Sequence, residues 1–251
     1  MSGGTFRLAV LHVNTNAAGV DELSESVAAA LPAEAAFEVL CARRGPESVE
    51  SYVDEAFAAA EVCELVRGNP SFDAYLVGCF SDPGLDAARE LTTAPVVGVA
   101  EAAYLSACLI ARRFAVLTTL RRGVPELEDS LRERGIAHRC VAVLATDVPV
   151  ADHGPQNAGS TRALIDAGRR SLSLGAEALV LACAGMAGVR RAVAEAVGLP
   201  VCDGVGFGAL LAYSTWKVGL QTSKAGAYSW PEPVPYAGME PFSERVVRTT
   251  R

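Results

Sequence analysis

The chain repeats one succession of apolar segments along its length. The matching pairs are RLAVLHV and RFAVLTT (7–13 and 113–119), Cys79 and Cys183, and PVVGV and PVCDGV (95–99 and 200–205), at offsets of 106, 104 and 105 residues. Because the three offsets agree within two residues, the chain is predicted to contain two homologous units. This repeat constrains the fold more than any other feature, since both units must form the same structure.

Within each unit, short apolar runs alternate with segments of helical periodicity. In the first unit, strands are expected at 7–14, 37–42, 74–78 and 95–99, and helices at 20–30, at 49–67 and from Leu85. Strands that alternate with helices of this length predict parallel sheets built from βαβ units. We therefore expect an α/β fold of two pseudo-symmetric lobes, each a parallel sheet flanked by helices. Residues 1–99, joined by the C-terminal segment 206–251, would form the first lobe, and residues 100–205 the second.

Two cysteines occupy matching positions, where a predicted strand passes into a helix. Cys79 follows the apolar run 74–78 and precedes a turn-forming segment, SDPG. Cys183 follows a similar run, with Gly185 and Gly188 in its turn. Free backbone N–H groups and the helix dipole at such turns favour a thiolate. We therefore expect the pKa of both thiols to move from about 8.5 towards neutral pH.

The repeat also predicts where these cysteines meet. Ligands of open α/β sheets bind outside the carboxyl ends of the strands. If two lobes face each other, Cys79 and Cys183 approach one cleft from opposite sides. One thiolate could then take a proton from one face of a carbon while the other thiol returns one to the opposite face. An enolate formed in this way needs hydrogen-bond donors, for which the candidates are Asn14, Thr15, Ser81, Thr118, Thr119, Gly185 and Gly204. Asp82 and Ala184 are expected to bind the substrate beside them.

Composition narrows the class of protein further. A net charge of −7 argues against a nucleic-acid partner, and no apolar run approaches the roughly 20 residues of a membrane helix. The MSGGTF start lacks the features of a signal peptide, and the seven cysteines form no CxxC pair. We expect a cytoplasmic protein with free thiols, a small-molecule substrate and a homo-oligomeric assembly.

No motif indicates a cofactor. The three histidines form no HxxxH pair or His/Cys cluster, so no metal site is expected, although His12 ends a strand near the predicted cleft. GVGFG (204–208) matches only half of a dinucleotide fingerprint, and neither a phosphate-binding loop nor a GxSxG motif occurs. We interpret the acidic side chains at the first helix start as ordinary solvated carboxylates: Asp21, Glu22 and Glu25.

The chain resembles the aspartate/glutamate/hydantoin racemase superfamily, and within it most closely the hydantoin racemases. The matching segments cover nearly the whole chain: VNTN (13–16), CFSDPGLDAARE (79–90), PVVGVAEAA (95–103), TTLRRGVPELE (118–128), LACAGMAGV (181–189), PVCDGV (200–205) and GLQTSKAGAY (219–228). The resemblance implies cofactor-independent racemisation of 5-substituted hydantoins or allantoin by two cysteines. The residue pattern around Cys79 and Cys183 independently indicates the same acid–base pair.

Two alternatives remain open at this point. The same fold could serve an aspartate or glutamate racemase, or a maleate-type cis–trans isomerase. A diacid would need several cationic or backbone clamps, and few arginines fall at the expected strand ends, although Arg121 and Arg122 follow Thr119. A neutral ring is therefore favoured. A non-catalytic, two-lobed binding protein is the other alternative, against which the paired thiols speak.

Overall fold

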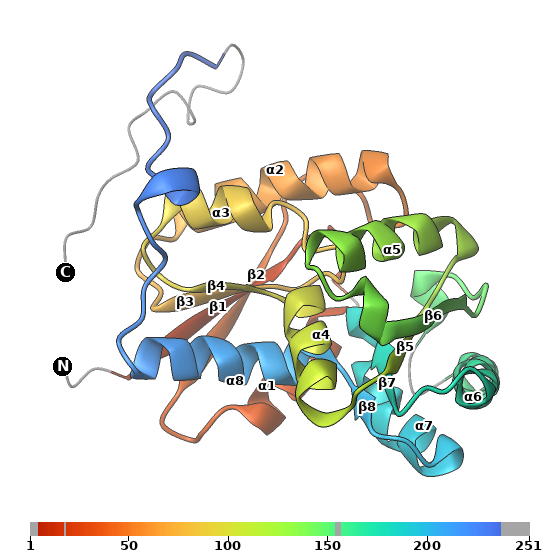
Figure 1. Cartoon of the computed structure of the whole chain (residues 1–251). Coiled ribbons are helices and arrows are strands. Elements are labelled where there is room, and N and C mark those ends of the chain that lie inside the picture. Colours follow the sequence, from red (N-terminus) through yellow and green to blue (C-terminus); the bar gives the residue numbers. More distant parts are fainter. Residues whose placement is uncertain (1–4, 18, 154–156, 237–251) are drawn as a thin grey trace.

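The computed structural model describes residues 5–17, 19–153 and 157–236, which form two four-stranded parallel sheets with helices around them (Figure 1). The first sheet and its helices comprise β1 (Arg7–His12), α1 (Gly19–Ala30), β2 (Ala36–Cys41), α2 (Tyr52–Gly68), β3 (Ala74–Val77), α3 (Leu85–Leu91) and β4 (Val96–Gly98). Helix α4 (Val99–Ile110) follows directly. The second set comprises β5 (Phe114–Thr118), α5 (Val124–Glu133), β6 (Cys140–Ala145), α6 (Ala158–Ser173), β7 (Ala178–Leu181), α7 (Arg190–Val197), β8 (Val201–Cys202) and α8 (Gly204–Lys217).

Both sheets have the same strand order, as the repeat predicts. The order is β2-β1-β3-β4 in one sheet and β6-β5-β7-β8 in the other, with every neighbouring pair parallel. The segments that begin at Pro95 and Pro200 provide the equivalent edge strands β4 and β8. The predicted α/β fold of two pseudo-symmetric lobes is therefore confirmed.

Side chains alternate between the two faces of each sheet, and both faces are buried. On β1, Ala9 and Leu11 pack towards α2 and α3, while Leu8 and Val10 face a core shared with α1, α4 and α8. The second sheet divides in the same way between α6 and α7 on one face and α4 and α5 on the other. Because this shared core contains residues of both sheets, the two lobes are joined by continuous apolar packing.

Helices α4 and α8 lie at the junction of the lobes. They pack against each other, and α8 also contacts α1, β3 and β4 (Figure 1). Helix α8 belongs to the C-terminal segment that was predicted to join the first lobe, and residues 237–251 of that segment lie outside the described residues. The lobe boundaries at 99 and 205 stay predictions. In the described part of the chain, no helix is both long and apolar enough to cross a membrane.

One helix begins later than its periodicity predicts, while α3 begins at the expected residue. Helix α2 begins at Tyr52 rather than near Val49, because the Ser51 side chain accepts a hydrogen bond from the Asp54 N–H and caps the helix there. Helix α3 begins at Leu85, and Gly84 before it has a left-handed backbone with a φ of 68°. Its ideal Cβ would lie 2.9 Å from the carbonyl oxygen of Ala59, so this turn requires glycine.

Candidate active site

A pocket of about 220 Å³ lies between the lobes, at the carboxyl ends of the central strands. We call it the interlobe pocket. His12 ends β1, Cys79 follows β3, Thr118 ends β5 and Cys183 follows β7, and all four line it. These strands occupy equivalent places in the two sheets, so the pseudo-symmetry brings equivalent residues to one cavity. The predicted cleft between the lobes is present.

Cys79 lies in the turn between β3 and α3. Its Sγ is 3.5 Å from the hydroxyl oxygen of Ser81, and its carbonyl accepts the N–H of Asp82 at 3.0 Å. Burial raises the pKa of the Cys79 thiol to about 11, although the hydroxyl and N–H of Ser81 favour the thiolate. The turn therefore holds a protonated thiol at neutral pH.

Cys183 lies at the start of a short 3₁₀ segment, Ala184–Val189, whose Met186 N–H donates to the Cys183 carbonyl at 3.1 Å. Burial raises the pKa of this thiol to about 12, and the N–H of Gly185 opposes that shift. Negative charge on Cys79 would raise it further. The two sulfurs are thus near enough that ionisation of one disfavours ionisation of the other.

The prediction that the turns move both thiol pKa values towards neutral pH is wrong. Backbone N–H groups do act on both sulfurs, but burial outweighs them. Helix α3 begins only at Leu85, six residues after Cys79, and Cys183 precedes a short 3₁₀ segment rather than an α-helix. Because the effect of a helix dipole falls off within about one turn, neither sulfur receives its full contribution.

The other residues that sequence analysis proposed for substrate binding divide into two groups. Six line the interlobe pocket with the cysteines: Asn14, Ser81, Thr118, Thr119, Ala184 and Gly185. Three are not among its lining residues: Thr15, Asp82 and Gly204. Thr15 donates its N–H and hydroxyl to the carbonyl of Pro46.

Gly204 and Asp82 have structural positions instead. Gly204 begins α8 where this helix crosses α4, and its ideal Cβ would lie 1.8 Å from the carbonyl oxygen of Val99. The Asp82 carboxylate accepts the N–H groups of Ala100 and Glu101 in the first turn of α4. Burial raises the pKa of Asp82 to about 7, although Arg134 and the N–H groups of α4 favour its ionised form.

Two histidines line the pocket: His12, which was expected near the cleft, and His153, which was not. His12 is hydrogen-bonded through Nε2 to the carbonyl of Asn16 at 2.7 Å, and burial lowers its pKa. His153, also with a lowered pKa, is hydrogen-bonded through Nε2 to the carbonyl of Val148 at 3.2 Å, so its Nδ1 is left as an acceptor. That atom is buried, as is the side-chain oxygen of Asn14, and neither has a hydrogen-bond partner among the described residues.

The pocket is also acidic. Five glutamates line it: Glu22, Glu47, Glu50, Glu55 and Glu126. Among the described residues that line it there is no lysine or arginine. The interpretation of Glu22 as an ordinary solvated carboxylate is wrong, since this side chain lines the pocket and burial raises its pKa. No local pattern indicates these glutamates, because they come from separate loops and helices.

Two of the pocket contacts join the lobes directly. Glu50 accepts the N–H of Val150 at 3.1 Å. Glu55 of α2 and Glu126 of α5 share a hydrogen bond, and burial together with the neighbouring carboxyl raises the pKa of Glu126 to about 8. Glu126 is therefore mainly protonated at pH 7, which allows two carboxyl groups to be neighbours. Within the residues that the structure describes, no group of three or more His, Cys, Asp or Glu side chains could hold a metal ion.

These features define a class of two-lobed α/β proteins with paired cysteines in a pocket at equivalent strand ends. A family model described as Asp/Glu/Hydantoin racemase matches residues 8–212. The chain is 33% identical to a hydantoin racemase of Pseudomonas sp. (strain NS671), over 97% of this chain and 99% of that one. It is 39% identical to a hydantoin racemase of Rhizobium meliloti, over 74% and 78% of the two chains.

The chain belongs to the Asp/Glu/hydantoin racemase family, and the predictions of this family and of an isomerase are confirmed. Among solved structures, an allantoin racemase from Klebsiella pneumoniae matches with a TM-score of 0.89 and 32% identity, over 94% of this chain and 98% of that one. A glutamate racemase from Bacillus anthracis, at 16% identity and a TM-score of 0.65 over 87% and 84% of the chains, shares the fold.

Proposed function

We propose that this protein racemises 5-substituted hydantoins or allantoin without a cofactor, with Cys79 and Cys183 as the acid–base pair. The observation that carries the proposal is the convergence of these cysteines, from equivalent strand ends of two homologous lobes, on one pocket. A thiolate on one side removes the proton from the ring carbon beside the carbonyl. The thiol on the other side protonates the resulting enolate from the opposite face.

The electrostatics of the two sulfurs support this division of roles. Racemisation needs one thiolate and one thiol at the same time, and the two charges disfavour each other. The burial that raises both pKa values also makes the rare thiolate a stronger base, because it is poorly solvated. The hydroxyl groups of Ser81, Thr118 and Thr119 line the same pocket and could donate to the enolate oxygen.

The charge of the pocket favours a neutral ring over an acidic substrate. A diacid would need cations to bind its carboxylates, whereas the described lining contains five glutamates and no lysine or arginine. The cavity of about 220 Å³ equals the liquid volume of about seven water molecules, which suits a small ring.

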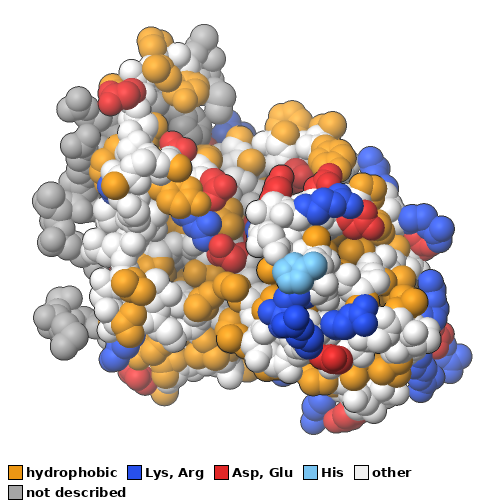
Figure 2. Space-filling view, in the orientation of Figure 1, with side chains coloured by type: hydrophobic (Ala, Val, Ile, Leu, Met, Phe, Trp, Pro, Cys, Tyr) orange, Lys and Arg blue, Asp and Glu red, His pale blue; other side chains and the backbone are white. Residues whose placement is uncertain are grey.

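Two further properties are proposed with this function. The seven cysteines are free, which fits the reducing cytoplasm. Exposed apolar side chains on α4 and α8, Leu105, Leu109, Ile110 and Leu210, favour a homo-oligomer. Figure 2 shows hydrophobic side chains over the region of these helices, while charged side chains gather over the second lobe.

Polarimetry tests the function with single enantiomers of several 5-substituted hydantoins, allantoin, aspartate and glutamate. Replacement of Cys79 or Cys183 by serine should lower the racemisation rate by at least roughly a hundredfold, because a serine hydroxyl does not ionise near pH 7. Cys41→Ser is the matched control, since Cys41 is a free, exposed cysteine at the end of β2. Racemisation of amino acids alone, or full activity of either single variant, would contradict the proposal.

A further inference from the structure

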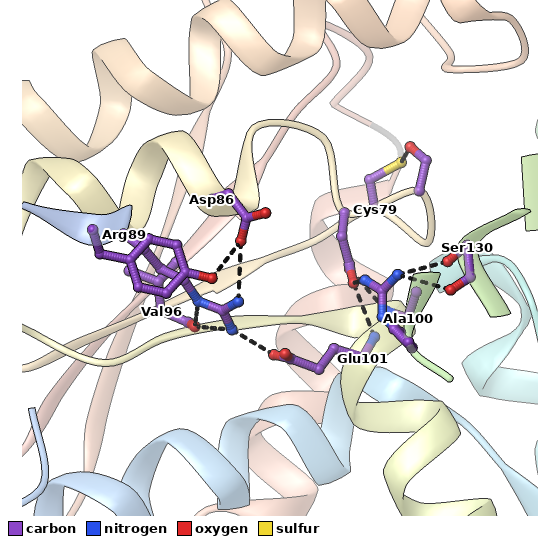
Figure 3. Close-up of polar contacts among 11 residues, drawn as sticks. Cys79, Asp86, Arg89, Val96, Ala100, Glu101 and Ser130 are labelled. Atoms are coloured by element: carbon purple, nitrogen blue, oxygen red, sulfur yellow. Dashed lines mark hydrogen bonds and ion pairs between the residues drawn. The ribbon is translucent and has the colours of Figure 1, made fainter. Parts of the chain in front are cut away.

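Asp82 joins the turn that carries Cys79 to two other parts of the molecule. It is one of two described non-glycine residues with a positive φ, at 49°, and only 2% of its side chain is exposed. Its two carboxylate oxygens accept the N–H groups of Ala100 and Glu101 in the first turn of α4, each at 2.9 Å (Figure 3). The carboxylate thus satisfies two donors at the start of a helix outside its own segment.

The start of α4 is shaped to receive this carboxylate. The residue at the N-cap of α4 is Gly98, which has no side chain to cap the helix. An ideal Cβ on Gly98 would lie 2.3 Å from the Asp82 carboxyl group. A larger residue here would therefore displace Asp82 from the N–H groups that it caps.

The third partner of Asp82 comes from the second lobe. Arg134, just after α5, donates to Asp82 Oδ2 at 2.9 Å and to the Ser130 hydroxyl at 2.7 Å. Its guanidinium also lies 5.9 Å from the centroid of the Tyr104 ring. One buried carboxylate therefore contacts the Cys79 turn, the connecting helix α4 and the end of α5.

The second cysteine turn has no carboxylate at the equivalent position, which makes the arrangement asymmetric. At the repeat offset of 104 residues, the position of Asp82 corresponds to Met186, an apolar side chain buried in the core. At the offset of 105, Gly98 corresponds to Asp203, which caps α8 itself by accepting the N–H groups of Val205 and Gly206. In the second lobe the capping carboxylate thus belongs to the helix, and it reaches the end of the Cys183 segment only through an ion pair with Arg190 at 3.1 Å.

We propose that Asp82 is a positioning residue for Cys79 alone, which ties its turn to α4 and to Arg134 of the second lobe. The inference rests on the proposed function where racemisation is measured, but the placement of the Cys79 turn can be tested without a substrate. Loss of the carboxylate should free the Cys79 turn and leave the Cys183 turn unchanged. A residue that only stabilised the fold would affect both cysteines alike.

Iodoacetamide labelling of Asp82→Asn, with each cysteine peptide quantified by mass spectrometry, measures this directly. At pH 8.5 the Asp82 carboxyl of the unchanged protein is ionised, since its pKa is about 7. Asparagine cannot pair with Arg134 and turns an N–H₂ group towards one backbone N–H. Cys79 should be labelled roughly tenfold faster, the effect of losing one hydrogen bond to a charged group, and Cys183 at an unchanged rate.

Asp147→Asn is the matched control. Asp147 is the other described non-glycine residue with a positive φ, and its carboxylate forms an ion pair with Arg121 at 2.8 Å. Neither residue lines the interlobe pocket. The charge of Asp82 also raises the pKa of Cys79, so its loss alone would speed labelling of that thiol. Arg134→Gln separates the two effects, because it removes the ion pair but keeps the charge and both amide contacts of Asp82; it should also speed labelling of Cys79. Equal changes at both cysteines, or no change at Cys79, would overturn the proposal.

Deuterium exchange gives the second measurement. In D₂O, the enantiomer that Cys183→Ser still exchanges is the one deprotonated by Cys79. Asp82→Asn should lose exchange of that enantiomer and keep exchange of the other, whereas equal loss of both would contradict a role limited to Cys79. If the unchanged protein racemises no compound of the panel, the proposed function fails, and the labelling result still decides the role of Asp82.

Discussion

The raised pKa values of the two cysteines can be tested by varying pH during alkylation. Only the thiolate reacts with iodoacetamide, so the labelling rate follows the ionised fraction. Burial holds the pKa of Cys79 at about 11 and that of Cys183 at about 12. Both rates should therefore rise about tenfold for each pH unit between pH 7 and pH 10, without a plateau.

The same values predict the order of reactivity. At pH 8 about one Cys79 side chain in a thousand and about one Cys183 side chain in ten thousand is ionised. A thiolate of higher pKa is also more nucleophilic, by roughly threefold for each unit. Because burial and the neighbouring Cys79 raise the pKa of Cys183 further, Cys183 should react more slowly than Cys79 in this range.

Stopped-time labelling followed by peptide mass spectrometry resolves the two sites, and the exposed Cys41 in the same sample serves as an accessible reference thiol. The variants Cys79→Ser and Cys183→Ser confirm the peptide assignment. A plateau in the labelling of either pocket cysteine below pH 9 would refute the reasoning. It would mean that the N–H groups of Ser81 and Gly185 outweigh burial.

Three predictions concern stability and are measured by urea unfolding. The Glu126 carboxyl has a pKa of about 8 in the folded protein against an ordinary 4.5, so the unfolding free energy should fall as pH rises between these values. Glu126→Gln should reduce that slope by at most about 1.4 kcal/mol per pH unit, and an unchanged slope would contradict the shared proton. Gly204→Ala places a Cβ against the Val99 backbone, which should lower the free energy of unfolding by about 1–3 kcal/mol or more. A decrease below about 0.5 kcal/mol would refute the close approach. Asp203→Ala removes the cap from two N–H groups of α8 and the ion pair with Arg190; the lost cap alone should lower the free energy of unfolding by about 0.5–2 kcal/mol, and no loss would argue against capping.

Much of the fold could be predicted from the sequence because its signals are local. The apolar runs that begin at Arg7 and Arg113 alternate with helical patterns over short distances, and this determines parallel βαβ units whatever surrounds them. The repeat then predicts one strand order for both sheets, as observed. It also places Cys79 and Cys183 at equivalent strand ends, where a cleft between the lobes forms.

The chemical environment of those cysteines depends on residues far away in the chain. A thiol pKa responds to every atom that replaces water around the sulfur, so burial reverses the shift expected from the local turn. Likewise Glu55 and Glu126 become neighbours only when α2 and α5 meet across the pocket.

Asp82 shows the same limit most clearly. Its position three residues after Cys79 suggests a pocket residue, yet its carboxylate reaches Ala100, Glu101 and Arg134. The sequence by itself determined the two lobes and the positions of the cysteines, because secondary-structure periodicity and the repeat are properties of neighbouring residues. Only the tertiary structure decided which side chains surround the sulfurs and which anchor them, because desolvation and ion pairing act through space between segments that no local pattern connects.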